Sequence, residues 1–355
     1  GRDNTALGFS AGATNTTGLE NTAIGMYALR FNTTGETNTA VGLQALHRNT
    51  TASNNTAVGR NAMEANTTGT YNVAVGVSSL AINTTGNYNV AMGALALDAN
   101  TSADSNTAVG YASLTTNTTG SGNTAYGRDS LAGNTTGSSN TAVGHDALDS
   151  NTTASNNTAV GAAALGANTT GFSNTAVGTN ALLTNTTGVT NVSIGMNTLK
   201  SNTTGGYNTA VGEGAALANT IGANNTGVGQ TALRFNTTGN NNVAVGKDAL
   251  YSNTTGAHNV CIGKDSGLSA VAITTGTGNS LLGTFSHTSA AGDNYANGIG
   301  YDINAAGGYT TVGKGTSDIR AAHGTATWAT VSDQRYKKDI VDSTAGLSFI
   351  NALQP

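Results

Sequence analysis

Few side chains in this 355-residue sequence are of types that do acid–base or nucleophilic chemistry, and the acidic residues come first. Paired carboxylates can hydrolyse glycosidic bonds. Asp129 and Asp146 have the same 17-residue spacing as Asp248 and Asp265. A basic residue directly precedes the first member of each pair, so we interpret the pairs as solvated surface charge and expect no glycosidase site.

The histidines and the single cysteine show no metal-ligand spacing. One cysteine excludes an internal disulfide framework, and Cys261 stands where most related segments have alanine, so we expect it to be a packing residue. We expect surface positions for the histidines and predict no metal and no cofactor. The histidines are His47, His145, His258, His287 and His323.

A 17-residue repeat must position all of these side chains. The motif Asn-Thr-Ala-Val-Gly starts at Asn4 and recurs with this period to Asn259, in sixteen copies. Numbered from that Asn, the consensus is N-T-A-V-G-x-x-A-L-x-x-N-T-T-G-x-x. The 61 Thr, 49 Gly and 45 Asn of the chain follow from this unit. Such a period is typical of a solenoid, and charged residues at only 9% argue against a disordered chain.

Positions 1–4 of the repeat read as a strand. Position 2 is Thr or Val, and position 4 is apolar in every copy, so we predict that position 4 points into a core. Position 3 faces the opposite way and is always small, which predicts close packing there too. The strand is therefore expected to be buried on both sides, with the Ala-Leu pair at positions 8–9 as a second apolar contact.

Glycine at positions 5 and 15 predicts bends, because glycine enters φ > 0 without strain. Positions 5–11 form a turn or a single helical turn, two alternatives that periodicity over so few residues leaves open. Positions 12–14 are expected to be a short extended piece. Together these features predict an all-β, parallel β-solenoid of sixteen 17-residue coils, about 75 Å long.

Stacked coils place each asparagine above the next, so we predict two asparagine ladders along the rod. Asn-Thr-Thr is also an N-glycosylation sequon, but a sugar on every rung, about 4.8 Å apart, would be crowded, so we favour the ladder. An ice-binding face of threonines is disfavoured, because adjacent threonines at positions 13 and 14 point to opposite faces. The predicted ladder and corner residues include Asn21, Asn38, Asn72, Asn32, Asn66, Asn83, Gly25, Gly42 and Gly76.

A single 17-residue coil encloses little volume, and small cores are marginal alone. We therefore expect a homotrimer that buries either the position-3 face or the position-2 and position-4 face between protomers. The alternative is a monomeric solenoid in which position 3 faces the opposite wall of its own coil.

The register of the repeat breaks after Gly263. We expect three segments: residues 1–263 as the repeat solenoid, 264–331 as an irregular β cap or neck, and 332–355 as a different, more highly charged module. The chain opens with Gly-Arg-Asp, so we expect a processed or partial chain.

The last segment resembles the opening of the endosialidase-type intramolecular chaperone domain of phage tail fibres and spikes. The residues that match are Ser-Asp-x-Arg-x-Lys-Lys-x-Ile from Ser332 and Gly-Leu-x-Phe-Ile-Asn-x-Leu-x-Pro from Gly346. The match is confined to the segment 332–355, so we expect only the start of that domain. The Asn-Thr-Ala-Val-Gly repeats are similar to the shorter head repeats of trimeric autotransporter adhesins.

These resemblances imply a homotrimeric, elongated fibre on a virion or a cell surface. That chaperone family cleaves itself at the Ser-Asp junction, which implies cleavage of the Ser332–Asp333 bond, with Ser332 as nucleophile and Lys337 as base. We expect no other enzymatic activity. The alternative is an autoprocessing tailspike whose glycan-degrading domain lies outside this chain.

The expected partners are further copies of the chain and a cell-surface receptor, which could be a glycan that stacks on exposed tyrosines such as Tyr71, Tyr88 and Tyr207. A net charge of −4 disfavours nucleic acid as a partner. No apolar run approaches the roughly 20 residues that span a bilayer, so no membrane insertion is expected.

Overall fold

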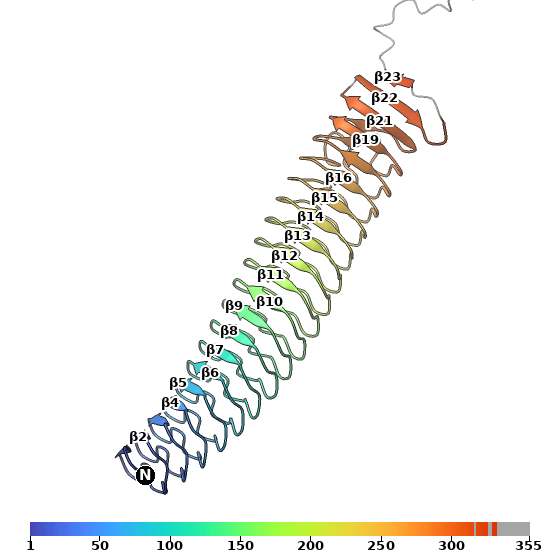
Figure 1. The fold of residues 1–355 in the computed structure, drawn as a ribbon. Coiled ribbons are helices and arrows are strands. Elements are labelled where there is room, and N and C mark those ends of the chain that lie inside the picture. Colours follow the sequence, from blue (N-terminus) through green and yellow to red (C-terminus); the bar gives the residue numbers. More distant parts are fainter. Residues whose placement is uncertain (316, 326–328, 332–355) are drawn as a thin grey trace, which may run out of the picture.

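The chain folds as a parallel β-solenoid, drawn out into a long rod (Figure 1). The computed structural model describes residues 1–315, 317–325 and 329–331. Within those residues every regular element is a strand and there is no helix. The N-terminus lies at one end of the rod and β23 (Ala329–Val331) at the other, with each coil stacked on the one before it (Figure 1).

Each repeat contributes one short strand at positions 2–4, and successive strands pair in parallel. The register is one full repeat, so that Thr5 pairs with Thr22 and Thr141 with Thr158. The strands are β1 (Thr5–Leu7), β2 (Thr22–Ile24), β3 (Thr39–Val41), β4 (Thr56–Val58), β5 (Val73–Val75), β6 (Val90–Met92), β7 (Thr107–Val109), β8 (Thr124–Tyr126), β9 (Thr141–Val143), β10 (Thr158–Val160), β11 (Thr175–Val177), β12 (Val192–Ile194), β13 (Thr209–Val211), β14 (Thr226–Val228), β15 (Val243–Val245) and β16 (Val260–Ile262).

The parallel stack continues past Gly263, where the period changes. Val260 pairs with Ser280, an offset of 20 in the sequence, and Asn297 pairs with Thr310, an offset of only 13. The stack then ends in an antiparallel meander of β21 (Tyr309–Lys314), β22 (Ser317–Ala322) and β23. The remaining strands are β17 (Ser280–Leu282), β18 (His287–Thr288), β19 (Asn297–Tyr301), β20 (Asn304–Ala305), β21 (Tyr309–Lys314), β22 (Ser317–Ala322) and β23 (Ala329–Val331), with β18 and β20 pairing as a separate small sheet.

The core of each coil is built from positions 3, 8 and 9. Ala142, Ala147 and Leu148 are all fully buried, and their counterparts form one column along the rod. Where position 3 is Gly227, a methyl group added there would lie 3.5 Å from a side-chain carbon of Leu233. The leucine at position 9 therefore fills the coil and leaves room only for a small residue opposite it.

The prediction that position 4 points into the core is wrong. In β9 the middle residue is buried, whereas Thr141 and Val143 on either side are only half-buried. Larger residues at position 4 are more exposed, such as Ile194 at 40%. The strand is thus buried on its position-3 face, and positions 2 and 4 face outward because the interior is already filled from the opposite wall.

Positions 5–11 form turns, which decides between the two alternatives left open by the sequence. Left-handed residues recur through each coil, for example Asp146 (φ 57°) at position 7 and Leu148 (φ 53°) at position 9, and this alternation prevents a helical turn. Gly144 at position 5 has φ 140°, and a Cβ there would lie 2.6 Å from the backbone oxygen of Gly161 in the next coil. Only glycine fits such a corner.

Candidate functional site

The residues predicted for self-cleavage lie outside the described part of the chain. These are Ser332, Asp333 and Lys337, in the segment that resembles the intramolecular chaperone domain. The candidate sites among the described residues are therefore those of the solenoid itself.

Two columns of asparagine run along the interior of the rod. At position 12, Asn32 Nδ2 donates to Asn15 Oδ1 (2.9 Å), and the same contact recurs in successive coils. At position 1, the backbone N–H of Asn38 donates to Asn21 Oδ1 (3.0 Å). The two columns converge on the position-15 carbonyl: the oxygen of Gly35 accepts from both Asn21 Nδ2 and Asn32 Nδ2, each at 2.9 Å.

These columns include every asparagine singled out from the sequence. Asn72, Asn66 and Asn83 are fully buried and bonded in the same way, and Gly42 and Gly76 form position-5 corners with φ of 136° and 139°. The corner at Gly25 has φ 128°. Because the position-12 amides are buried and bonded to neighbouring coils, they offer no free nitrogen for a sugar in the folded chain.

Each aspartate of the two pairs singled out from the sequence lies beside the basic side chain that precedes it in the chain. Arg128 Nε lies 3.1 Å from Asp129 Oδ2, and His145 Nδ1 lies 3.0 Å from Asp146 Oδ2. The ligand atoms of Asp129, His145 and Asp146 are within 4.8 Å of one another, which a cation could bridge. The Arg128 guanidinium contacts both Asp129 and His145, so a positive charge already lies within this cluster. Burial, followed by the neighbouring carboxylates, raises the pKa of Asp149 beside it.

Cys261 is fully buried at position 3 of its coil. Burial raises the pKa of its thiol to about 12, against a smaller lowering by a hydrogen bond with Ser266. A thiol in this state is not a nucleophile at neutral pH. Its place in the core is that of the alanines in other coils.

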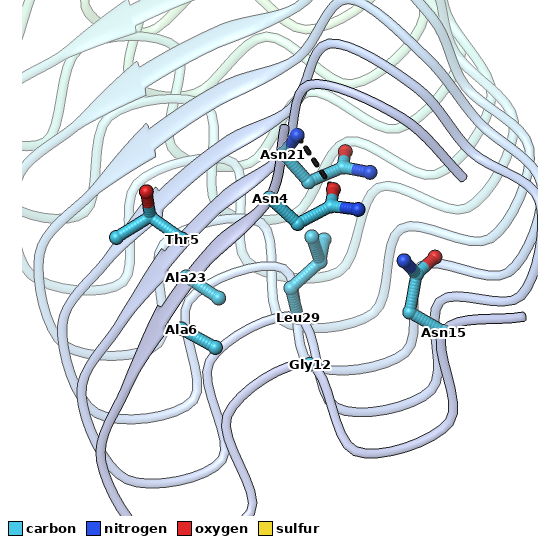
Figure 2. A pocket seen from close by; sticks show the side chains of 8 residues that line it. All are labelled: Asn4, Thr5, Ala6, Gly12, Asn15, Asn21, Ala23 and Leu29. Atoms are coloured by element: carbon cyan, nitrogen blue, oxygen red, sulfur yellow. Dashed lines mark hydrogen bonds between the residues drawn. The ribbon is translucent and has the colours of Figure 1, made fainter. Parts of the chain in front are cut away.

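One pocket lies at the N-terminal end of the rod (Figure 2). Ala6 and Ala23 point inward toward Leu29, while Thr5 points away from the interior, and the backbone N–H of Asn21 donates to Asn4 Oδ1 (2.9 Å). The pocket is the open end of the core column and contains no acid, base or thiol. It is lined by Asn4, Thr5, Ala6, Gly12, Asn15, Asn21, Ala23 and Leu29.

Two surface features were not anticipated from the sequence. The first is the outer stripe, defined here as the outward side chains at positions 2 and 4 of β1 to β17. It runs along the sheet from β1 to β17, carries no charged residue, and exposes Met92 (44%), Tyr126 (58%) and Ile194 (40%). The sequence does show that position 4 is always apolar, but it led us to predict that this side chain points into the core.

The second such feature is a pair of arginine–aromatic clusters. The octapeptide Ala-Leu-Arg-Phe-Asn-Thr-Thr-Gly occurs at 28–35 and again at 232–239, twelve repeats apart. In each copy the arginine lies over the ring of the following phenylalanine, at 5.1 Å for Arg30 and Phe31 and at 5.8 Å for Arg234 and Phe235. The sequence could have indicated these clusters, because the two octapeptides are identical even at positions 10 and 11, which vary in the other repeats.

The tyrosines expected to stack on sugars lie on the surface at position 17. Tyr71 and Tyr88 are 54% and 61% exposed and stack on each other, with ring centroids 5.3 Å apart and planes 7° apart. Tyr207 is 60% exposed.

Comparison with protein-family models and with curated proteins gave no match for this chain. In the part of the chain that the structure describes, no helix has the length and hydropathy to cross a bilayer.

Proposed function

We propose that this chain is the shaft or head of a homotrimeric fibre, of the kind found in phage tail fibres and bacterial surface adhesins, whose role is reach and attachment. The observation that carries the proposal is the outer stripe, because its position-4 row is apolar in every coil and monomeric proteins rarely expose a contiguous apolar row of this length. A second copy of the same stripe is equally long and equally regular, so it fits without a change of register.

The stripe is large enough to drive association. Complete burial of an isoleucine side chain stabilises by about 1.5–3 kcal/mol, so burying the exposed 40% of Ile194 contributes roughly 0.6–1.2 kcal/mol. Most coils have a smaller, half-buried valine at position 4, so about 0.5–1 kcal/mol per coil is an upper limit, and over sixteen coils position 4 contributes at most roughly 8–16 kcal/mol per protomer. This is comparable with the estimated loss of translational and rotational freedom, about 4–15 kcal/mol.

Threefold symmetry is supported by the resemblances of the repeats and of the last segment, both of which imply trimers. Three rods can bring their stripes together around one axis parallel to their length, and such cyclic assemblies close on themselves. Ser332 and Lys337 would then belong to the chaperone module that assembles the trimer and cuts the Ser332–Asp333 bond.

Light scattering after size-exclusion chromatography tests the assembly. The wild-type chain should have the mass of three protomers. A variant with Val143→Glu, Val160→Glu and Val177→Glu should be monomeric, because three adjacent coils would each bury a charge at the interface.

The matched control carries Thr136→Glu, Thr153→Glu and Thr170→Glu on the exposed position-14 row, and it should remain trimeric. A monomeric wild-type chain would refute the assembly. For self-cleavage, the complete gene is expressed with and without Ser332→Ala. Chains of identical, uncut mass in both preparations would show that Ser332 does not cleave.

A further inference from the structure

We propose that the two arginine–aromatic clusters are binding sites for an acidic polysaccharide, one that carries carboxylate groups. This deepens the proposed function, on which it rests, by naming the attachment sites and the chemical class of the receptor. Each cluster consists of the arginine and phenylalanine of the repeated octapeptide and the aromatic residue at position 10 of the next coil.

The two clusters share one geometry although they lie far apart. Phe31 packs edge-on against His47, with centroids 5.0 Å apart and an interplanar angle of 81°. Phe235 packs in the same way against Tyr251, at 5.0 Å and 88°. The two clusters also share a backbone hydrogen bond: the N–H of each phenylalanine donates to the carbonyl of its aromatic partner at 3.1 Å. The stacking of coils therefore builds the same pair of rings twice, and Tyr27 adds a third ring to the first cluster.

The guanidinium group of each cluster's arginine is held against an aromatic ring but is not paired with a carboxylate. Arg30 lies 4.9 Å from the centroid of Tyr27 and 5.1 Å from that of Phe31. Among the described residues neither Arg30 nor Arg234 has a carboxylate within ion-pair distance, whereas Arg128 does. The buried Nε of Arg234 has no hydrogen-bond partner. A guanidinium held against a ring keeps its outer N–H groups for a planar anion such as a carboxylate.

The phenylalanine beside each arginine supplies an apolar surface. Phe31 is 39% exposed and Phe235 is 44% exposed, despite their contacts with the next coil. Exposed aromatic surface next to a forked cation matches a sugar ring, which has an apolar C–H face and, in an acidic sugar, a carboxylate at its edge. Nucleic acid fits less well, because a chain with a net charge of −4 and one arginine in each cluster offers few phosphate contacts.

The separation of the clusters favours a polymer over a single sugar. Twelve coils at about 4.8 Å place the clusters roughly 58 Å apart along the rod. One extended chain can contact both, and the second contact is then intramolecular, which raises the apparent affinity by a large factor without any new contact. A single cluster is expected to bind weakly.

Affinity electrophoresis through gels that contain polygalacturonate, alginate or hyaluronan tests the proposal, with dextran as the neutral polymer. The wild-type chain should be retarded by at least one acidic polymer and not by dextran. The double variant Arg30→Gln and Arg234→Gln should lose at least tenfold in apparent affinity, and each single variant should lose most of that because bridging is lost.

The matched control is Arg60→Gln with Lys200→Gln, which removes the same net charge. Lys200 also occupies position 10, but no aromatic ring accompanies it at position 11. Equal losses in the control and the test variant, retardation by dextran as strong as by the acidic polymers, or no retardation by any of the three acidic polymers would overturn the proposal. Light scattering on the same samples reports the trimer independently, so a failed binding site and a failed assembly give different results.

Discussion

Asn151, in the middle of the rod, is the residue at which the asparagine column can be tested most directly. Its Nδ2 donates to Asn134 Oδ1 (2.8 Å) and to the carbonyl of Ala154 (3.0 Å), and its Oδ1 accepts from Asn168 Nδ2 (3.0 Å). Asn151→Ala removes all three bonds from a side chain that is fully buried.

The size of the effect follows from what each partner retains. The Ala154 carbonyl still accepts from Asn140 Nδ2 (2.8 Å), so it stays satisfied. The oxygen of Asn134 loses its side-chain donor, and one N–H of Asn168 loses its acceptor. A buried polar group left unpaired costs about 1–3 kcal/mol, so two of them give a loss of roughly 2–6 kcal/mol in the local free energy of unfolding.

Hydrogen exchange measured by mass spectrometry is the suitable assay, because coils of a solenoid contact only their neighbours and can open locally. In peptides that cover the coils on either side of Asn151, protection should fall by a factor of roughly 30 to 10⁴, since about 1.4 kcal/mol corresponds to tenfold. Peptides from the two ends of the rod should be unchanged.

Two further variants separate hydrogen bonding from packing. Asn151→Asp keeps the volume of the side chain but replaces the donor by an acceptor, so at neutral pH it should destabilise at least as much as alanine. Thr153→Ala changes an exposed residue of the same coil and should alter the local free energy by less than about 0.5 kcal/mol. Protection in the Asn151→Ala chain within threefold of wild type would refute the view that the column holds the coils together.

Gly144→Ala should lower the free energy of unfolding, measured by chemical denaturation, by at least about 3 kcal/mol, because φ is 140° and the new Cβ would meet the next coil. Gly122→Asn is the control: φ is 69° and the nearest atom lies 3.8 Å from an added Cβ, so the free energy of unfolding should change by less than about 1 kcal/mol. Equal effects of the two substitutions would contradict the assignment of Gly144 to a corner. Cys261, whose pKa burial raises to about 12, should resist a thiol reagent at pH 8 until the chain is unfolded, and rapid labelling of the folded chain would show that the core opens there. Burial raises the pKa of Asp149, as do two nearby carboxylates, and an acid with a raised folded pKa destabilises the fold at pH values above its unfolded pKa of about 3.9. Asp149→Asn should therefore raise the melting temperature at pH 7 and leave it unchanged at pH 3, and a gain at both pH values would point to another cause.

The 17-residue repeat and its recurring glycine and asparagine positions could be predicted from the sequence. A period of 17 with glycine at position 5 and asparagine at positions 1 and 12 predicts stacked coils, and the parallel pairing of Thr5 with Thr22 has that period. The three-residue insertion after Gly263 was also visible, although the sheet absorbs it as one longer coil between β16 and β17. The structure of positions 5–11 could not be read, because it depends on left-handed residues such as Leu148, which the residue type does not reveal.

The candidate sites were harder to predict from the sequence, because their residues come together only in the tertiary structure. Arg30 and Phe31 are adjacent in sequence, but their cluster needs His47, which reaches them only because the next coil stacks beside them at a fixed register. The residues of the predicted self-cleavage site lie outside the described part of the chain, so that assignment still rests on the resemblance of residues 332–355.

By itself the sequence determined that identical coils stack and that buried asparagines and corner glycines repeat along the stack, because a strict period can be satisfied in every copy only by the same local structure. It also determined that each strand has one small face and one face of larger residues, threonine or valine at position 2 and apolar residues at position 4, since side chains alternate with a period of two. Only the tertiary structure decided which face is inside. The leucine at position 9, such as Leu148, crosses the narrow coil and leaves space for nothing larger than Ala142, so the valines turn outward and become the surface on which we propose that copies of the chain meet.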